Sequence, residues 1–296
     1  ASDKETFLVP AMNVRMWEHK ATQKNLNTLF NYGYKFIGPQ DGEMACGEYG
    51  KGKMSSPRQI ISYLENFFKQ KDYFKKKNIR ATVTAGPTRE YIDPVRYISN
   101  ESSGKQGYEI ALELSRLGIK TTLISGPTNI NYSNEIKVKK IISGKQMFNE
   151  IKKTLPTDIA VCTAAVSDFK PVMKNKQKLK KKINLDKIQL EQNPDILEFL
   201  GKNNRHRPKL LVGFSAETEN IIKNSVEKMH EKHCDIIVAN DVSSRETGFN
   251  VDFNEVTIIE NNGEIQKIKK GSKKFIASLI AKKIINSFLD IKKRLN

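Results

Sequence analysis

Apolar positions in the larger, C-terminal part of the chain alternate between strand-like and helix-like runs. Short apolar runs with few polar interruptions are typical of strands buried on both faces, whereas apolar residues three and four apart indicate helices. The strand-like runs are 79–85, 119–125, 158–164, 209–214 and 235–239, and the helix-like runs are 104–117, 145–153, 194–203 and 218–232. This alternation predicts β-α-β units and a Rossmann-like α/β domain, in which a parallel sheet has helices on both faces.

The rest of the pattern suggests how the chain is divided. Residues 256–268 alternate around Asn261-Asn-Gly-Glu like a β-hairpin, and 272–295 carry apolar residues at the spacing of a docked helix. Earlier in the chain, 21–32 and 57–68 are predicted to be helices, and a glycine-rich loop, 38–54, separates them. The charged stretch 69–78 predicts a domain boundary, so we expect domains at 1–74 and 75–296.

Residues 86–107 connect the first predicted strand of the second domain to its first helix. A connection of this length is usually functional rather than a simple turn. Ser102, Ser103 and Gly104 precede the helix, where unpaired backbone N–H groups and the helix dipole favour an anion. The loop is therefore predicted to hold a phosphate.

Three more polar loops follow predicted strands, at 163–171, 213–218 and 239–242. The carboxyl ends of parallel strands meet at one edge of a sheet, where ligands of α/β proteins bind. A single Asp or Asn in such a loop is commonly a helix cap. Several polar loops at the same edge indicate a ligand site, because caps alone do not require them to converge.

The net charge of +18 invites comparison with nucleic-acid-binding proteins. Only ten of the 51 basic residues are Arg, and Lys is spread along the whole chain without a nucleic-acid motif, so we expect no nucleic-acid partner.

No apolar run approaches the roughly 20 residues of a membrane span, and no signal sequence is recognisable. Three scattered cysteines fit a reducing compartment. We therefore expect a cytoplasmic protein without a membrane partner.

Residues 174–182 form the densest charge run, Lys-Asn-Lys-Gln-Lys-Leu-Lys-Lys-Lys. Such a run by itself is usually a solvated loop. Here it follows the polar loop at 163–171, so its lysines can close over a triphosphate and offset charge as pyrophosphate departs.

The motifs of these loops resemble a known family. The matching stretches are Thr84-Ala-Gly-Pro-Thr-Arg-Glu, Asp93-Pro-Val-Arg-Tyr-Ile-Ser-Asn, Ser102-Ser-Gly-Lys, Ala164-Ala-Val, Asn193-Pro-Asp-Ile, Gly213-Phe, Ala216-Glu-Thr and Ala239-Asn-Asp-Val. Together they resemble the phosphopantothenate-cysteine ligase half of the bacterial bifunctional coenzyme A biosynthesis proteins. Before them, Pro10-Ala-Met-Asn, Met16-Trp and Ala45-Cys-Gly-Glu look like the end of the decarboxylase half.

The resemblance implies a CTP-dependent ligase. The family activates the carboxylate of 4'-phosphopantothenate as an acyl cytidylate, with Mg²⁺ expected on the triphosphate, and cysteine then displaces CMP. Asn100 and Lys178 match the catalytic positions of the family, and Arg96 matches a contact to the anionic substrate. The nucleotide-binding positions carried over from the family are Cys162, Thr163, Ala164, Asp168, Lys178, Pro194, Asp195, Ile196, Leu197, Phe214, Lys228 and Lys232. Lys228 and Lys232 are four apart on one helix face, so two ammonium groups can face one polyphosphate.

For residues 1–74 the resemblance implies the C-terminal part of a flavodoxin-like α/β domain, that of an FMN-dependent phosphopantothenoylcysteine decarboxylase. Cys46 is then the proton donor and Asn13 contacts the substrate carboxylate. The flavin-binding loop and catalytic His of the family have no counterpart in the sequence, so we expect that this chain alone does not decarboxylate. By resemblance, the ligase domain forms a homodimer, and a complete decarboxylase half would form higher oligomers.

The sequence departs from the family pattern at four positions. Tyr91, Gln106 and Ser167 replace the expected Pro, Met and Ala, and these changes are mild. Lys53 stands where the decarboxylase usually has Arg, and a lysine does not reproduce the planar fork of a guanidinium.

Two other classes of protein predict different features. A nicotinamide-dependent oxidoreductase of Rossmann type needs a Gly-x-Gly-x-x-Gly turn after its first strand, but Ala85-Gly-Pro-Thr stands there. A basic, non-catalytic binding module is the second alternative, which a nucleotide-binding measurement separates from a ligase.

Overall fold

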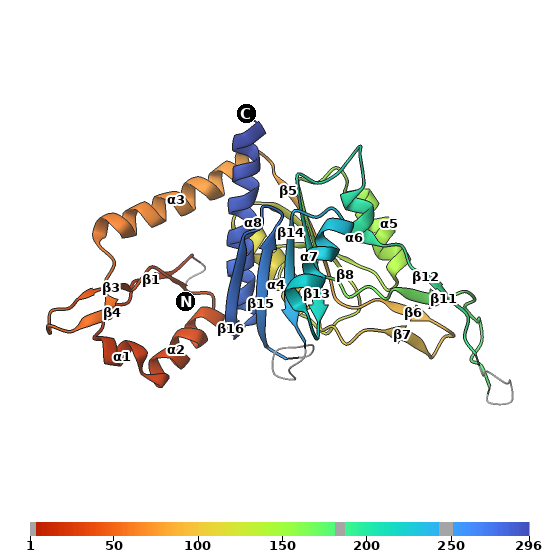
Figure 1. Cartoon of the computed structure of the whole chain (residues 1–296), viewed down its shortest axis with the longest axis horizontal. Helices are drawn as coiled ribbons and strands as arrows, with labels where there is room; N and C mark the ends of the chain where they lie inside the picture. Colours follow the sequence, from red (N-terminus) through yellow and green to blue (C-terminus); the bar gives the residue numbers. More distant parts are fainter. Residues whose placement is uncertain (1–3, 181–186, 243–250, 296) are drawn as a thin grey trace. The chain divides into compact units, whose positions relative to one another are not determined.

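The computed structural model describes residues 4–180, 187–242 and 251–295, and the chain forms two compact units, Ala1–Tyr73 and Phe74–Asn296 (Figure 1). The division falls inside helix α3 (Pro57–Lys76). The prediction that α3 ends at residue 68 is therefore wrong: the helix continues through most of the charged stretch. Phe74 lies on an apolar position of α3, is fully buried and packs beside Phe288 with ring centroids 6.5 Å apart, which stabilises this extra length.

The first unit contains two short sheets and the predicted helix. Its elements are β1 (Phe7–Leu8), α1 (Val14–Glu18), α2 (Lys20–Asn31), β2 (Lys35–Phe36), β3 (Gln40–Glu43) and β4 (Tyr49–Lys53). β1 pairs with β2 in parallel, and β3 pairs with β4 as an antiparallel hairpin. The hairpin replaces much of the predicted glycine-rich loop. Its strands have almost no apolar alternation, so backbone pairing decides their structure.

The second unit is built on an eight-stranded sheet with the order β16-β15-β14-β13-β10-β5-β8-β9 (Figure 1). Its parallel strands are β5 (Arg80–Ala85), β8 (Lys120–Ser125), β9 (Lys137–Lys140), β10 (Ile159–Cys162), β13 (Leu210–Glu217) and β14 (Ile236–Asp241). β15 (Phe253–Glu260) and β16 (Ile265–Ser272) form the predicted hairpin and extend one edge in antiparallel fashion. The predicted α/β fold is confirmed. β9 was not predicted, because three of its four residues are lysines and it therefore has no apolar run.

Helices cover both faces of this sheet. α4 (Lys105–Arg116) and α8 (Lys273–Leu295) pack against each other, while α5 (Gly144–Thr154), α6 (Ile196–Gly201) and α7 (Ile221–Glu231) cover the other face (Figure 1). Among the described residues, no helix is long and apolar enough to cross a membrane. α6 is shorter than the predicted 194–203, because Asp195 caps its start: the side chain accepts a hydrogen bond from the Glu198 N–H.

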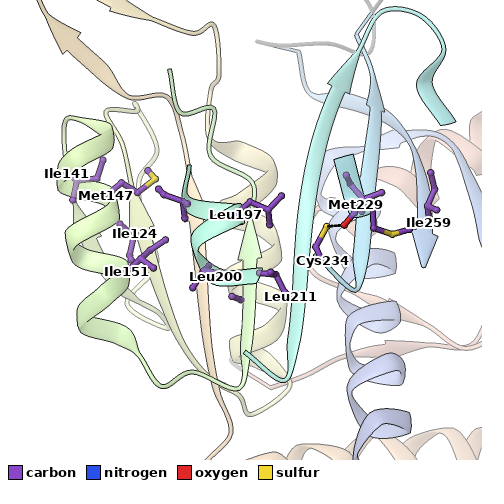
Figure 2. Packing of buried hydrophobic residues seen from close by; sticks show 13 residues of the cluster. Ile124, Ile141, Met147, Ile151, Leu197, Leu200, Leu211, Met229, Cys234 and Ile259 are labelled. Carbon is purple, nitrogen blue, oxygen red and sulfur yellow. Dashed lines mark hydrogen bonds between the residues drawn. The ribbon is translucent and has the colours of Figure 1, made fainter. Parts of the chain in front are cut away.

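The core on the α5–α7 face joins these helices to alternate residues of the strands. Met147 and Ile151 from α5 belong to the same buried cluster as Leu200 from α6 and Leu211 from β13 (Figure 2). The neighbouring strand residue Val212 is equally buried. Both faces of the strands are therefore apolar, which explains why these strands read as continuous apolar runs in the sequence.

Two ribbons project from the strand ends of the second unit. β6 (Arg89–Tyr91) and β7 (Tyr97–Ser99) form a hairpin inside the predicted loop 86–107, and β11 (Phe169–Pro171) pairs with β12 (Leu190–Gln192). Asp93 makes the turn of the first hairpin, because its Oδ1 accepts hydrogen bonds of 2.8 Å from the N–H groups of Val95 and Arg96. The long loop is thus a structured ribbon before it enters α4.

Candidate functional site

Two adjoining cavities open where β5, β10 and β13 end. The first has a volume of about 400 Å³ and the second about 390 Å³. Their shared wall consists of Ala164, Val166, Asp168, Phe214 and Lys228. The predicted convergence of the strand-end loops is therefore seen in the structure, since the Ala164–Asp168 loop and the β13 strand contribute to both cavities.

The first cavity gathers most of the residues carried over as nucleotide-binding. Those that line it are Cys162, Ala164, Asp168, Pro194, Asp195, Ile196, Leu197, Phe214, Lys228 and Lys232. Asn193, which belongs to a family motif of the sequence but was not predicted as a site residue, also lines it. Its Nδ2 donates to the Ser167 carbonyl at 2.8 Å, while its Oδ1 is buried without a hydrogen-bond partner. A buried acceptor left unpaired is costly, so this wall suits a ligand that brings a donor.

Cys162 ends β10 in the wall of the first cavity. Burial raises the pKa of its thiol to about 12, so the thiolate is scarce at neutral pH. A neutral thiol packs as a small apolar group. Cys162 therefore shapes the cavity rather than acting as a nucleophile.

Lys228 in α7 and Lys232, the residue directly after α7, differ more in their surroundings than their spacing of four suggests. The Lys232 ammonium lies 3.2 Å from Asp195 and 3.0 Å from Glu198, and these contacts raise its pKa, with the hydrogen bond to Glu198 as the largest cause. Lys228 lines both cavities, and within the described residues no carboxylate lies at ion-pair distance from it. Lys228 is thus available for an anion, whereas Lys232 must first exchange its carboxylate partners.

The second cavity contains the N-terminus of α4. Thr163 and Asn100 line it, and the Asn100 amide donates to the Ala165 carbonyl at 3.0 Å. Gly104 precedes α4 with a left-handed φ of 74°, and no side chain caps the helix. Gly107 lets the first turn of α4 approach the strand ends, because a Cβ at this position would lie 2.1 Å from Thr163 Oγ1.

The two remaining ligase residues, Arg96 and Lys178, line neither cavity. Lys178 is exposed on the lysine-bearing segment 174–180, and the last two lysines of the predicted run, Lys181 and Lys182, lie outside the described residues. The Arg96 guanidinium donates to Asp93 Oδ2 at 2.6 and 2.9 Å and to the Leu179 carbonyl at 2.9 Å. The contact of Arg96 with an anionic substrate stays a prediction, because here the guanidinium already has partners.

The β6–β7 hairpin holds the lysine-bearing segment by its backbone. The Leu179 N–H donates to Asp93 Oδ2 at 3.3 Å, and the Asn175 N–H donates to the Ile92 carbonyl at 2.9 Å. Burial of the Asp93 carboxylate opposes its ionisation, but hydrogen bonds from backbone N–H groups and from the Arg96 side chain outweigh this and hold its pKa well below the usual range. Asp93 therefore remains charged and holds Leu179, the residue that follows Lys178.

Replacing Asp93 with Asn is expected to loosen this segment. The neutral amide keeps the turn acceptor but loses the charge that holds Arg96, and with it the support of Leu179. We expect trypsin to cleave after the lysines of 174–180 about tenfold faster than in the parent. Glu101→Gln is the matched control, since Glu101 is exposed and the change removes the same charge. Equal cleavage of Asp93→Asn and the parent would contradict the anchoring role.

In the first unit, Asn13 and Cys46 share the same carboxylate neighbour. Asn13 caps α1, and its Nδ2 donates to Glu48 Oε2 at 2.5 Å. The exposed Cys46 has its Sγ 4.0 Å from the same oxygen, and Arg15 pairs with Glu48 at 3.2 Å. The predicted decarboxylase residues are thus neighbours, with Glu48 between them.

No group of three or more His, Cys, Asp or Glu side chains in the described ranges could hold a metal ion. Mg²⁺ typically uses one or two carboxylates together with substrate phosphates. Asp168 and Asp195 line the first cavity and can supply such oxygens. The residues present therefore fit a metal that arrives with a triphosphate.

Comparison with known proteins agrees with this architecture. Residues 76–288 match the family described as the DNA/pantothenate metabolism flavoprotein C-terminal domain, and residues 1–69 match the flavoprotein family. The coenzyme A biosynthesis bifunctional protein CoaBC of Haemophilus influenzae is 40% identical over 97% of this chain and 71% of its own length. The CoaBC protein of Bacillus subtilis is 36% identical over 92% of this chain and 67% of its own length.

Solved structures show the same fold. The crystal structure of the C-terminal domain of a CoaBC protein superposes with a TM-score of 0.61 at 35% identity, over 72% of this chain and 96% of that domain. A Cab2 mutant in complex with phosphopantothenate-cysteine superposes with a TM-score of 0.58 at 16% identity, over 81% of this chain and 96% of that chain, and this shows the fold alone.

The fold and the strand-end cleft define a pantothenate-metabolism α/β domain that follows a flavoprotein segment. The chain belongs to the CoaBC family of coenzyme A biosynthesis proteins. The prediction of a phosphopantothenate-cysteine ligase of this family, preceded by part of a flavoprotein decarboxylase, is confirmed.

Proposed function

We propose that the second unit joins 4'-phosphopantothenate to cysteine with CTP as the activating nucleotide. The observation that carries this proposal is the wall shared by the two cavities. Most of the nucleotide residues line one cavity, and Asn100 with the α4 N-terminus lines the other. A nucleotide and an acid bound on either side of this wall can bring an α-phosphate and a carboxylate together.

The chemistry has two steps. A carboxylate oxygen of the acid attacks the α-phosphorus of CTP, the bond to the β-phosphate oxygen breaks, and pyrophosphate leaves. The amine of cysteine then attacks the acyl carbon, the bond to the CMP oxygen breaks, and the amine loses a proton. The mixed anhydride is needed because a free carboxylate is a poor acylating agent.

The position of each side chain indicates its role in these two steps. Lys228, in the shared wall, stabilises the charge on the α-phosphate, and Asn100 holds the acyl group by hydrogen bonds. Lys178 closes from its tethered segment and stabilises the departing pyrophosphate. Asp168 accepts a hydrogen bond from the exocyclic amine of cytosine. Asp195, the other aspartate of the first cavity, could supply an oxygen to Mg²⁺, which would neutralise part of the triphosphate charge.

The first unit provides part of a decarboxylase site. Asn13 is proposed to bind a substrate carboxylate and Cys46 to donate a proton, with Glu48 orienting the Asn13 amide. FMN, as the family implies, would supply the oxidation of the substrate thiol. A homodimer of the ligase unit and a cytoplasmic location remain predictions.

Pyrophosphate release tests the ligase proposal. With CTP, 4'-phosphopantothenate and Mg²⁺ but no cysteine, we expect about one pyrophosphate per active site, because the acyl cytidylate stays bound. Adding cysteine should give continuous release and stoichiometric CMP. CTP with Mg²⁺ should also raise the melting temperature, while NADPH and oligonucleotides should not. Absence of pyrophosphate in both arms would overturn the proposed function.

A further inference from the structure

Glu90 ends the first of the motifs that the chain shares with its family, and the proposed reaction has not used it. It is the middle residue of β6 and is only 4% exposed. Its Oε1 accepts a hydrogen bond of 2.8 Å from the N–H of Gly144, the first residue of α5. Within the described residues, no basic side chain lies at ion-pair distance from the Glu90 carboxylate. The N-terminus of an 11-residue helix therefore stabilises this buried carboxylate.

The start of α5 packs against the wall of the first cavity. A Cβ on Gly144 would lie 3.1 Å from the Val166 side chain and 3.3 Å from that of Asn193, so the helix start is in close contact with both. Val166 and Asn193 line the first cavity. The Asn193 N–H in turn donates to the Asp168 carbonyl at 2.8 Å. A shift of α5 at Gly144 would therefore displace residues that are proposed to surround the nucleotide.

Glu90 is also part of the ribbon that holds the lysine-bearing segment. A second contact joins β6 to the start of α5, because the Arg89 N–H donates to the Ile142 carbonyl at 2.8 Å. At the turn of the same ribbon, the Asp93 carboxylate accepts from the Leu179 N–H at 3.3 Å. One ribbon therefore contacts the start of α5 near its base and the lysine-bearing segment at its turn.

We propose that Glu90 is a positioning residue of the ligase, which fixes the first cavity and the lysine-bearing segment in one geometry. The inference rests on the proposed function and extends it, since Glu90 lines neither cavity and touches no substrate. The first step of the reaction needs both parts, because Lys178 stabilises pyrophosphate as it leaves a nucleotide bound in that cavity. Nucleotide binding and order of the segment are then linked in both directions.

Glu90→Gln tests this assignment. The amide keeps an acceptor for the Gly144 N–H but loses the charge that the helix N-terminus favours, and it brings two N–H donors to a buried place. We expect kcat to fall about 30-fold and the KM for CTP to rise about fivefold, because a displacement of roughly 1 Å can cost up to about 100-fold. The KM for 4'-phosphopantothenate should stay within about twofold, since neither Glu90 nor Gly144 lines the second cavity. Parental values of kcat and of the KM for CTP, or an equal rise in both KM values, would overturn the proposal.

Glu150→Gln is the matched control. Glu150 lies on α5 and the change removes the same charge, but its carboxylate pairs with Lys153 at 2.6 Å and lines neither cavity. We expect kcat and both KM values to stay within about twofold of the parent. A loss as large as that of Glu90→Gln would show that the net charge of α5 is decisive and would contradict a role of the contact at Gly144.

Gly144→Pro removes the N–H group that donates to Glu90. Proline suits the first position of a helix, and Ser143 before it already has the extended backbone that precedes a proline, with φ −109° and ψ 161°. Both single variants break the same contact, so their fold losses in kcat/KM for CTP should not multiply in the double variant. A double variant that loses the full product of the two single losses would refute a direct coupling of Glu90 to α5.

Proteolysis of the parent protein keeps the test independent of variant folding. Saturating CTP with Mg²⁺, without the acid substrate, should slow trypsin cleavage after the lysines of 174–180 about fivefold in the parent and less than about twofold in Glu90→Gln. Full protection in the variant, or none in the parent, would refute the link. If the parent releases pyrophosphate but Glu90→Gln keeps the parental kinetics, only the positioning role fails, whereas absence of release refutes the ligase proposal itself.

Discussion

Lys178→Gln is expected to lower ligase turnover about 100- to 1000-fold, as removal of one preorganised charge from a transition state commonly does. In the proposed mechanism Lys178 acts after its segment closes, since in this structure it is exposed and lines neither cavity. The KM for CTP should change little, since the residues of the first cavity remain. Single-turnover release of pyrophosphate measures the first step, and release of CMP after addition of cysteine measures the second, so together they show which step is slowed.

Lys176→Gln is the control for this variant. Lys176 is exposed on the same segment, two residues earlier, so the change removes the same charge from the same part of the chain. We expect less than a threefold effect, as for a solvent-screened lysine. If both variants lose activity equally, the total charge of the segment is decisive; if Lys178→Gln activates and condenses at the parental rate, its assigned role is wrong.

Gly107→Ala is expected to damage both stability and catalysis. The added Cβ would lie 2.1 Å from Thr163 Oγ1 and 2.7 Å from the Ala85 Cβ, so the first turn of α4 must move away from the strand ends. Overpacking of this kind lowers the free energy of unfolding by about 1–3 kcal/mol, which exceeds the gain of up to about 1 kcal/mol from helix propensity. A shift of about 1 Å at the α4 N-terminus should lower turnover roughly 100-fold.

Gly144→Ala provides the comparison for Gly107→Ala. Gly144 also begins a helix beside a strand-end loop, but a Cβ there would approach Val166 only to 3.1 Å and Asn193 to 3.3 Å. We expect a change in unfolding free energy below about 0.5 kcal/mol, measured from urea midpoints at equal slope. Equal midpoints and equal turnover for the parent and Gly107→Ala would show that the close approach of α4 is not required.

The fold was predictable where apolar periodicity is strong. The runs that became β5, β8, β10, β13 and β14 are buried on both faces, so hydrophobicity alone marks them. The short ribbons were not predictable, because β12 has three exposed residues and its pairing with β11 depends on a distant part of the chain. Helix α3 continued past its predicted end for a related reason: Phe74 is stabilised by burial against Phe288.

The candidate site was predictable where residues lie in strand-end motifs. Asn193 and Asn240 stand inside motifs quoted from the sequence, yet only burial shows that each leaves an oxygen unpaired. The contact between Glu90 and Gly144 had no signal at all, because it joins residues 54 positions apart. The pairing of Lys232 with Glu198 likewise joins residues 34 positions apart.

The sequence by itself determined the family, the order of the buried strands and the longer helices of the second unit, and the loops that carry chemistry, because these depend on local periodicity and on motifs within a few residues. The tertiary structure decided which of those side chains are available. Asp93 meets Leu179 across 86 residues, and Gln106 meets Lys273 across 167. Whether a charge is paired, buried or free depends on such distant contacts, and packing of the whole chain, rather than local sequence, creates them.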